Sequence, residues 1–149
     1  MSENEGRITR LWLTMIRVSD MKKAVNFYNK TLDLPLALYA KTFNHAEVGP
    51  VEPLAKIGLY ATGKKSKRKT RTGIVFDTDD IYKLYENLQK KGVRFIMKPT
   101  RMEWGGIMTE FLDPDNNIFQ VVQDKNHYKA TIAHSKAIPR PKSYSGTRI

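Results

Sequence analysis

Residues 13–28 read LTMIRVSDMKKAVNFY, and a change of period inside this stretch decides the fold class. From Leu11 to Val18 the chain is apolar and β-branched enough for a strand, with side chains alternating between two faces. Ser19-Asp20 is typical of a helix start. The apolar positions that follow recur at helical spacing: Met21, Ala24, Val25, Tyr28 and Leu32. The stretch therefore predicts a strand followed directly by a helix.

The second half of the chain repeats this order at an offset of 60 residues, which places Asp20 on Asp80 and Tyr28 on Leu88. Punctuating Gly, Pro and Asn residues separate the other apolar runs. The further strands are expected at 35–41, 45–48, 56–61, 73–78, 93–98, 107–112 and 117–122, with a second helix from Asp80 to about Lys91. Four strands for each helix favour an α+β fold over a parallel doubly wound one.

An internal duplication is the simplest explanation of this repeat. The sequence predicts an α+β fold built from two βαβββ modules, residues 11–61 and 72–124, whose mixed sheets curve around a cup. Together they form one domain, residues 11–124. Residues 1–10 are interpreted as an N-terminal arm and residues 125–149 as a basic C-terminal tail.

The composition limits the class of protein. The chain has 149 residues, 40% of them hydrophobic, which suits one compact domain with a filled core. It has no cysteine, so a disulfide framework, a Cys-ligated metal and a cysteine nucleophile are excluded. No apolar run approaches the length that crosses a bilayer, and the first residues do not resemble a targeting segment. We expect a soluble, cytoplasmic protein with no membrane partner.

The net charge of +11 is concentrated in two segments. Lys64 to Arg71 and residues 125–149 together hold 12 of the 26 Lys and Arg residues. Such segments can bind phosphates electrostatically, so one hypothesis is binding of nucleic acid or another acidic partner. No nucleic-acid motif accompanies them, and charge runs are usually solvated.

Two motifs in the chain resemble those of a known superfamily. Leu13 to Asp20 looks like the opening strand of glyoxalases with its leading His replaced, and Phe27-Tyr28 in the next helix strengthens the likeness. FLDPDNNIFQVV at 111–122 is similar to the family's Asp-Pro-Asp-Gly-Asn turn, with Asn116 in the glycine position. The resemblance is to the vicinal oxygen chelate superfamily of glyoxalases, bleomycin-resistance proteins and dioxygenases. It implies a glyoxalase-like fold and a homodimer.

The resemblance also implies a test for metal chemistry, because metal-dependent members place one ligand on each of four strands facing the cup. The matching positions here are Leu13, Gly58, Gly73 and Gln120. Leucine and glycine offer no side-chain donor, and one amide oxygen cannot hold a divalent transition ion. We therefore expect no metal and no cofactor at this site.

Other residues keep an enzymatic alternative open. His45 and Glu47 would share a strand face and form half of a displaced metal site. A buried Glu110 is a weak candidate for a catalytic base with a raised pKa, and Arg17 is a candidate anion contact. The alternative function is thus a lyase, isomerase or dioxygenase with an unconventional metal site. Solvated or ion-paired roles explain the same residues.

The expected cup lining is mostly apolar, aromatic and small, which suits a flat organic ligand. The candidate ligand-binding residues are Leu13, Met15, Arg17, Gly58, Tyr60, Gly73, Val75, Trp104 and Gln120. The favoured interpretation is a small-molecule-binding protein that resembles the drug-sequestering branch of the superfamily. The same side chains would also suit a closed core or contact with a second subunit.

Overall fold

The computed structural model of the chain describes residues 6–8, 11–49 and 56–124. Most of the expected N-terminal arm and the whole basic tail lie outside the described residues. Within them, none of the helices combines the length and the apolar character that a membrane crossing requires.

Each module forms a four-stranded mixed sheet with the same strand order, β1-β4-β3-β2 in the first and β5-β8-β7-β6 in the second. The first module consists of β1 (Leu13–Val18), α1 (Met21–Val25), the π-helix η1 (Asn26–Thr31), β2 (Leu36–Ala40), the 3-10 helix η2 (Lys41–Phe43), β3 (His45–Val48) and β4 (Lys56–Ala61). The second consists of β5 (Thr70–Asp77), α2 (Ile81–Lys90), β6 (Arg94–Arg101), β7 (Ile107–Leu112) and β8 (Asn117–Gln123). The predicted α+β fold with two βαβββ modules is confirmed.

Equivalent caps start the two long helical segments. The side chains of Asp20 and Asp80 each accept a hydrogen bond from the backbone N–H three residues later, both at 3.1 Å. Each cap satisfies one of the N–H groups that a helix leaves without an intrahelical partner. The Asp20–Asp80 equivalence expected from the sequence is therefore present in the structure.

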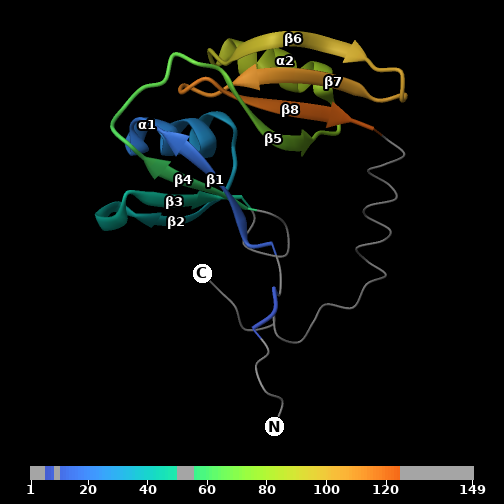
Figure 1. The fold of residues 1–149 in the computed structure, drawn as a ribbon. Coiled ribbons are helices and arrows are strands. Elements are labelled where there is room, and N and C mark those ends of the chain that lie inside the picture. The colour runs from blue at the N-terminus through green and yellow to red at the C-terminus, as the bar shows by residue number, and fades with distance from the viewer. Residues whose placement is uncertain (1–5, 9–10, 50–55, 125–149) are drawn as a thin grey trace.

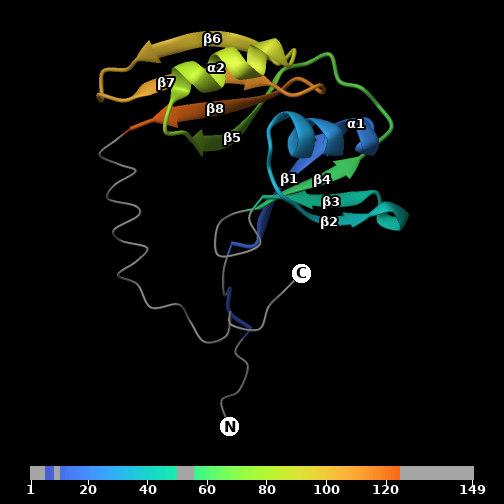
Figure 2. The same cartoon turned by 180° about the vertical axis from the view of Figure 1, so that it is seen from behind.

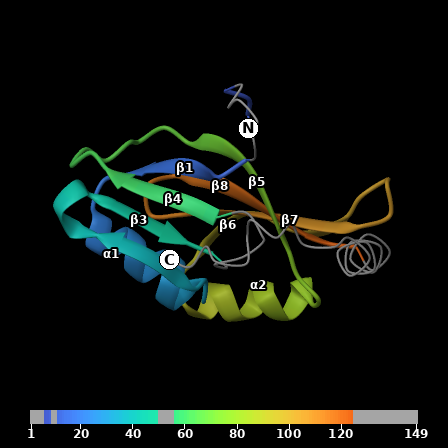
Figure 3. The same ribbon diagram turned by 90° about the horizontal axis from the view of Figure 1, so that it is seen from below.

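Helices α1 and α2 lie on the same side of the sheets, behind them in Figure 1 and in front of them in Figure 2. Figure 3 shows the two helices along one edge of the molecule, with the strands on the other side. Among the residues that the structure describes, no helix covers the opposite side of each sheet, which we call the open face. β1 and β5 are each an edge strand of their sheet, and residues of both strands line one cavity, described below.

One aromatic core joins the two modules on the helical side. Phe27 and Tyr28 of η1 reach the second sheet, where the ring of Tyr28 lies 5.8 Å from that of Phe119 in an edge contact. The Phe119 ring also stacks on Phe111 and Phe76, each at 5.5 Å between centroids. Because these rings come from both modules, the modules share one core.

Several element boundaries differ from the prediction. β1 begins at Leu13, since Leu11 and Trp12 lie outside the strand and are exposed. β5 begins at Thr70, three residues before the predicted start at Gly73. The pairing of β5 with β8 is irregular between Arg71 and Val75. Thr70, Arg71 and Thr72 are polar, so the apolar signal that predicts a strand starts only after them.

Candidate functional site

The open face of the first sheet carries apolar side chains that are only partly covered. Met15 on β1 and Tyr60 on β4 are 42% and 40% exposed. Their strands pair in parallel, with Met15 opposite Gly58 and Arg17 opposite Tyr60. A Cβ at Gly58 would clash with the sulfur of Met15 and lie 3.0 Å from Leu13. Gly58 thus makes the room in which Met15 lies across β4.

The four positions at which metal-dependent relatives would hold an ion lie on four different strands, β1, β4, β5 and β8. The side chains of Leu13 and Met15 both lie next to Gly58, as described above. Gly73 sits in the irregular part of β5 with φ of 73°, and Gln120 donates through Nε2 to Glu110 at 3.2 Å. In the part of the chain that the structure describes, no three His, Cys, Asp or Glu residues are grouped so that they could hold an ion.

His45 and Glu47 do come together on the first sheet, with 3.3 Å between His45 Nε2 and Glu47 Oε1. The other carboxylate oxygen of Glu47 accepts from Lys56 Nζ at 3.2 Å, and Glu47 and Lys56 are both buried. The ammonium group compensates the carboxylate and places a positive charge beside it. Coulomb repulsion by that charge disfavours a divalent cation at the same carboxylate.

Glu110 is paired with Arg71 across the second sheet, from β7 to β5. Both terminal guanidinium nitrogens of Arg71, Nη1 and Nη2, donate to the carboxylate. The Arg71 hydrogen bond holds the pKa of Glu110 below its ordinary value, although burial opposes this shift. The expected upward shift was therefore wrong in direction, because no sequence pattern indicates that Arg71, at the end of the basic loop from Lys64 to Arg71, reaches β7. A carboxylate held in this way is a poor general base near neutral pH.

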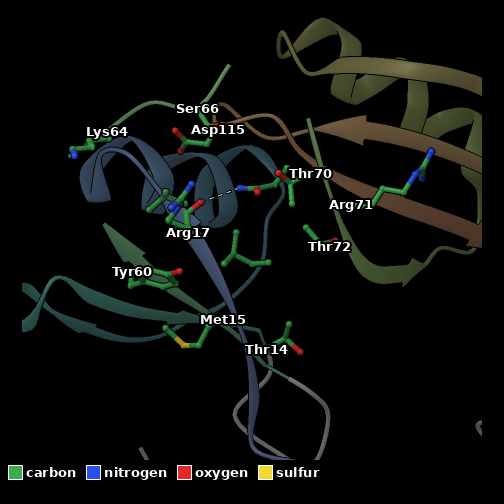
Figure 4. A pocket seen from close by; sticks show the side chains of 13 residues that line it. Thr14, Met15, Arg17, Tyr60, Lys64, Ser66, Thr70, Arg71, Thr72 and Asp115 are labelled. Carbon is green, nitrogen blue, oxygen red and sulfur yellow. Dashed lines mark hydrogen bonds between the residues drawn. The ribbon is translucent and has the colours of Figure 1, made fainter. Parts of the chain in front are cut away.

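A cavity of about 330 Å³ lies where the edge of β1 faces the edge of β5 (Figure 4). It is lined by Thr14, Met15, Ile16, Arg17, Val18, Tyr60, Lys64, Ser66, Thr70, Arg71, Thr72, Asp115 and Asn117. The volume lies at the lower end of the range of small-molecule sites. We call it the β1/β5 cavity.

Three of the candidate residues, Met15, Arg17 and Tyr60, line this cavity, whereas the other six do not. Val75 lies on β5 and is exposed. Trp104 is in the loop between β6 and β7, where a Cβ at Gly106 would overlap its ring. The sequence interpretation missed the contributions of the 64–72 segment and of the 113–117 turn, although both segments had been singled out for other reasons.

Side chains of the 113–117 turn form hydrogen bonds with the basic loop and with the first module, and so connect both to the second sheet. Asn116, in the left-handed region with φ of 65°, donates through Nδ2 to the carbonyl of Ser66 at 2.9 Å. Asn117 donates through Nδ2 to the carbonyl of Arg17 at 3.1 Å. Glycine at position 116 would make the same turn without a side chain to reach the loop. The departure from the expected glycine therefore has a structural role.

We expect Asn116→Gly to change the free energy of unfolding by less than about 1 kcal/mol, because relief of the left-handed strain offsets the lost hydrogen bonds. Amide exchange around Ser66 should nevertheless become several-fold faster, as measured by hydrogen–deuterium exchange. Asn44→Gly is the matched control. Asn44 also has a positive φ of 48°, and in the described part of the chain its side chain makes no hydrogen bond. Equal effects of the two substitutions on the loop would contradict the tether.

The region that matches known proteins is nearly the same as the span of the two modules described above. The model of the glyoxalase/bleomycin resistance protein/dioxygenase superfamily matches residues 10–121. A member of that superfamily from Sphaerobacter thermophilus has a similar structure, with a TM-score of 0.68 and 32% identity over 78% of this chain and 98% of that one. TnmS3, an antibiotic binding protein from Streptomyces, superposes with a TM-score of 0.64 and 25% identity over 79% of this chain and 98% of its own. The uncharacterized protein YraH of Bacillus subtilis is 30% identical, over 70% of this chain and 90% of its length.

Proposed function

Because the chain belongs to the glyoxalase/bleomycin resistance protein/dioxygenase superfamily, we propose that it binds a small organic molecule without metal-dependent chemistry. The observation that carries the proposal is the β1/β5 cavity, which has Met15 and Tyr60 on its wall. Both side chains are partly exposed, so they offer a ligand apolar surface and one aromatic ring.

The superfamily's metal positions support binding over metal chemistry. Leu13, Gly58 and Gly73 have no donor side chain, and the amide of Gln120 is engaged with Glu110. The two carboxylates considered as alternative metal or catalytic sites are paired with cations, Glu110 with Arg71 and Glu47 with Lys56. The antibiotic-binding relative TnmS3 points in the same direction.

The test is a titration of the full chain, purified without added ions, with a panel of polycyclic aromatic compounds followed by amide chemical shifts. We expect shifts in β1 and β4 that are the same with and without a chelator. Tyr60→Ala should weaken binding by about 3–10-fold, because one aromatic contact contributes about 0.5–1.5 kcal/mol.

Tyr82→Ala is the matched control, since Tyr82 is an exposed tyrosine on α2 that does not line the cavity. It should leave the affinity unchanged. The proposal fails if no compound shifts β1 or β4, if a chelator abolishes binding, or if the two tyrosine substitutions have the same effect.

A further inference from the structure

The β1/β5 cavity has an apolar end and a charged end. Figure 4 shows Met15 and Tyr60 below Arg17, with Asp115 and Ser66 above it. All five residues line the cavity. A ligand that fills the cavity would therefore place an apolar group against Met15 and Tyr60 and a polar head near Arg17 and Asp115.

The charged end carries Arg17, whose guanidinium group forms no ion pair within the described part of the chain. Among residues 11–49 and 56–124, no carboxylate lies within ion-pair distance of Arg17, in contrast to Arg71, which is held by Glu110. Lys64 is a second basic residue in the lining of the cavity. A guanidinium group matches the planar geometry of a carboxylate, with two parallel N–H donors for two oxygens. Arg17 is thus suited to an anionic head group.

Asp115 independently indicates that the ligand carries a hydrogen-bond donor. It is only 8% exposed, and its Oδ1 has no hydrogen-bond partner among the described protein groups. Its backbone N–H is engaged with Asp113, so the turn that holds Asp115 is fixed. A buried acceptor without a donor destabilises the fold, more so when it is charged, and a ligand that supplied the donor would relieve this destabilisation. An ammonium group satisfies both the charge and the hydrogen bond.

We propose that the β1/β5 cavity recognises an amino-acid-like zwitterion, with a carboxylate at Arg17, an ammonium group at Asp115 and an apolar body against Met15 and Tyr60. This assignment rests on the proposed small-molecule binding and names the ligand class for it. Arg17 and Asp115 act together as the specificity determinants. Asn116, through its bond to Ser66, holds one wall of the cavity in place.

The test uses four compounds that share one aromatic body: 3-(2-naphthyl)-L-alanine, its N-acetyl derivative, its amide, and the N-acetyl amide. These carry both charges, the carboxylate alone, the ammonium alone, and neither. Binding to the full chain is measured by calorimetry and by amide shifts. The zwitterion is expected to bind at least about tenfold more tightly than either singly charged form, because each charged hydrogen bond contributes about 1.5–3 kcal/mol.

Two substitutions separate the two contacts. Arg17→Gln should remove the preference for the free carboxylate and keep the preference for the free ammonium. Asp115→Asn should do the reverse. Urea unfolding of each variant checks that it folds, and Arg17 is exposed, so its replacement does not threaten the core.

The outcomes distinguish this assignment from the function on which it rests. Equal affinities for the four compounds would refute the zwitterion while leaving small-molecule binding intact. Failure of the zwitterion to bind, or the same loss of preference in both variants, would also overturn it. Small-molecule binding itself is refuted by the separate titration with the aromatic panel, through the three outcomes given for it above.

Discussion

Replacing Asp113 by alanine should lower the free energy of unfolding by about 3–5 kcal/mol, among the largest effects of any single substitution in this chain. The side chain of Asp113 accepts hydrogen bonds from Tyr28 Oη, from the backbone N–H groups of Asp115 and Asn117, and from Asn117 Nδ2. All four donors are buried or nearly so, and alanine leaves three of them without this acceptor, while Asn117 Nδ2 keeps only its bond to the carbonyl of Arg17. The Tyr28 bond also joins the two modules. Urea denaturation followed by circular dichroism measures the loss.

Asp113→Asn is the informative control, because its Oδ1 still accepts the two backbone N–H groups. The decrease in the free energy of unfolding should be clearly smaller for Asp113→Asn than for Asp113→Ala. If the two variants were equally unstable, the charge of Asp113 would matter more than the turn that it organises.

The same residue predicts a dependence on pH. Burial raises the pKa of Asp113 above its ordinary value, although its hydrogen bonds oppose the shift. The folded chain therefore holds this proton more tightly than the unfolded chain. The resulting stability is fully present below the ordinary pKa of about 3.9 and is lost as pH rises through the folded value. Relative to Asp113→Asn, which does not titrate, the unaltered chain should lose stability between pH 4 and pH 7. A constant difference over that window would contradict this prediction.

Phe119→Ala should cost about 3–5 kcal/mol, because it leaves a cavity in the shared aromatic core. Phe119 is completely buried and contacts rings from η1, β5 and β7. Since these rings come from both modules, both should unfold together at a lower urea concentration. Tyr82→Ala removes an exposed aromatic ring from α2 and should cost less than about 1 kcal/mol. Separate unfolding transitions for the two modules in Phe119→Ala would argue against one common core.

The fold was largely predictable because its signals are local. Each signal lies within a short stretch of sequence. The signals are the Asp20 and Asp80 caps, the change from strand to helix period after β1 and after β5, and the turns with left-handed Asn44 and Asn116. The start of β5 was missed because its first residues, Thr70, Arg71 and Thr72, are polar and give no apolar signal for a strand.

The site was less predictable because it depends on contacts between distant parts of the chain. Asn117 and Arg17 are 100 residues apart in sequence, and Asn116 and Ser66 are 50 apart. Alternation along β1 and β4 placed Met15, Arg17 and Tyr60 on the open face. No sequence pattern indicates that the Asp-Pro-Asp turn brings Asp115 to the cavity, or that Arg71 pairs with Glu110.

The most direct test of the account is a crystal structure of the full chain, purified without added ions and grown with 3-(2-naphthyl)-L-alanine. The account predicts density for the naphthyl group beside Met15 and Tyr60, with its carboxylate at Arg17, its ammonium group at Asp115 Oδ1, and no metal in contact with it. Density for a metal ion held by protein side chains on the open face, with the compound bound to that ion, would contradict the account.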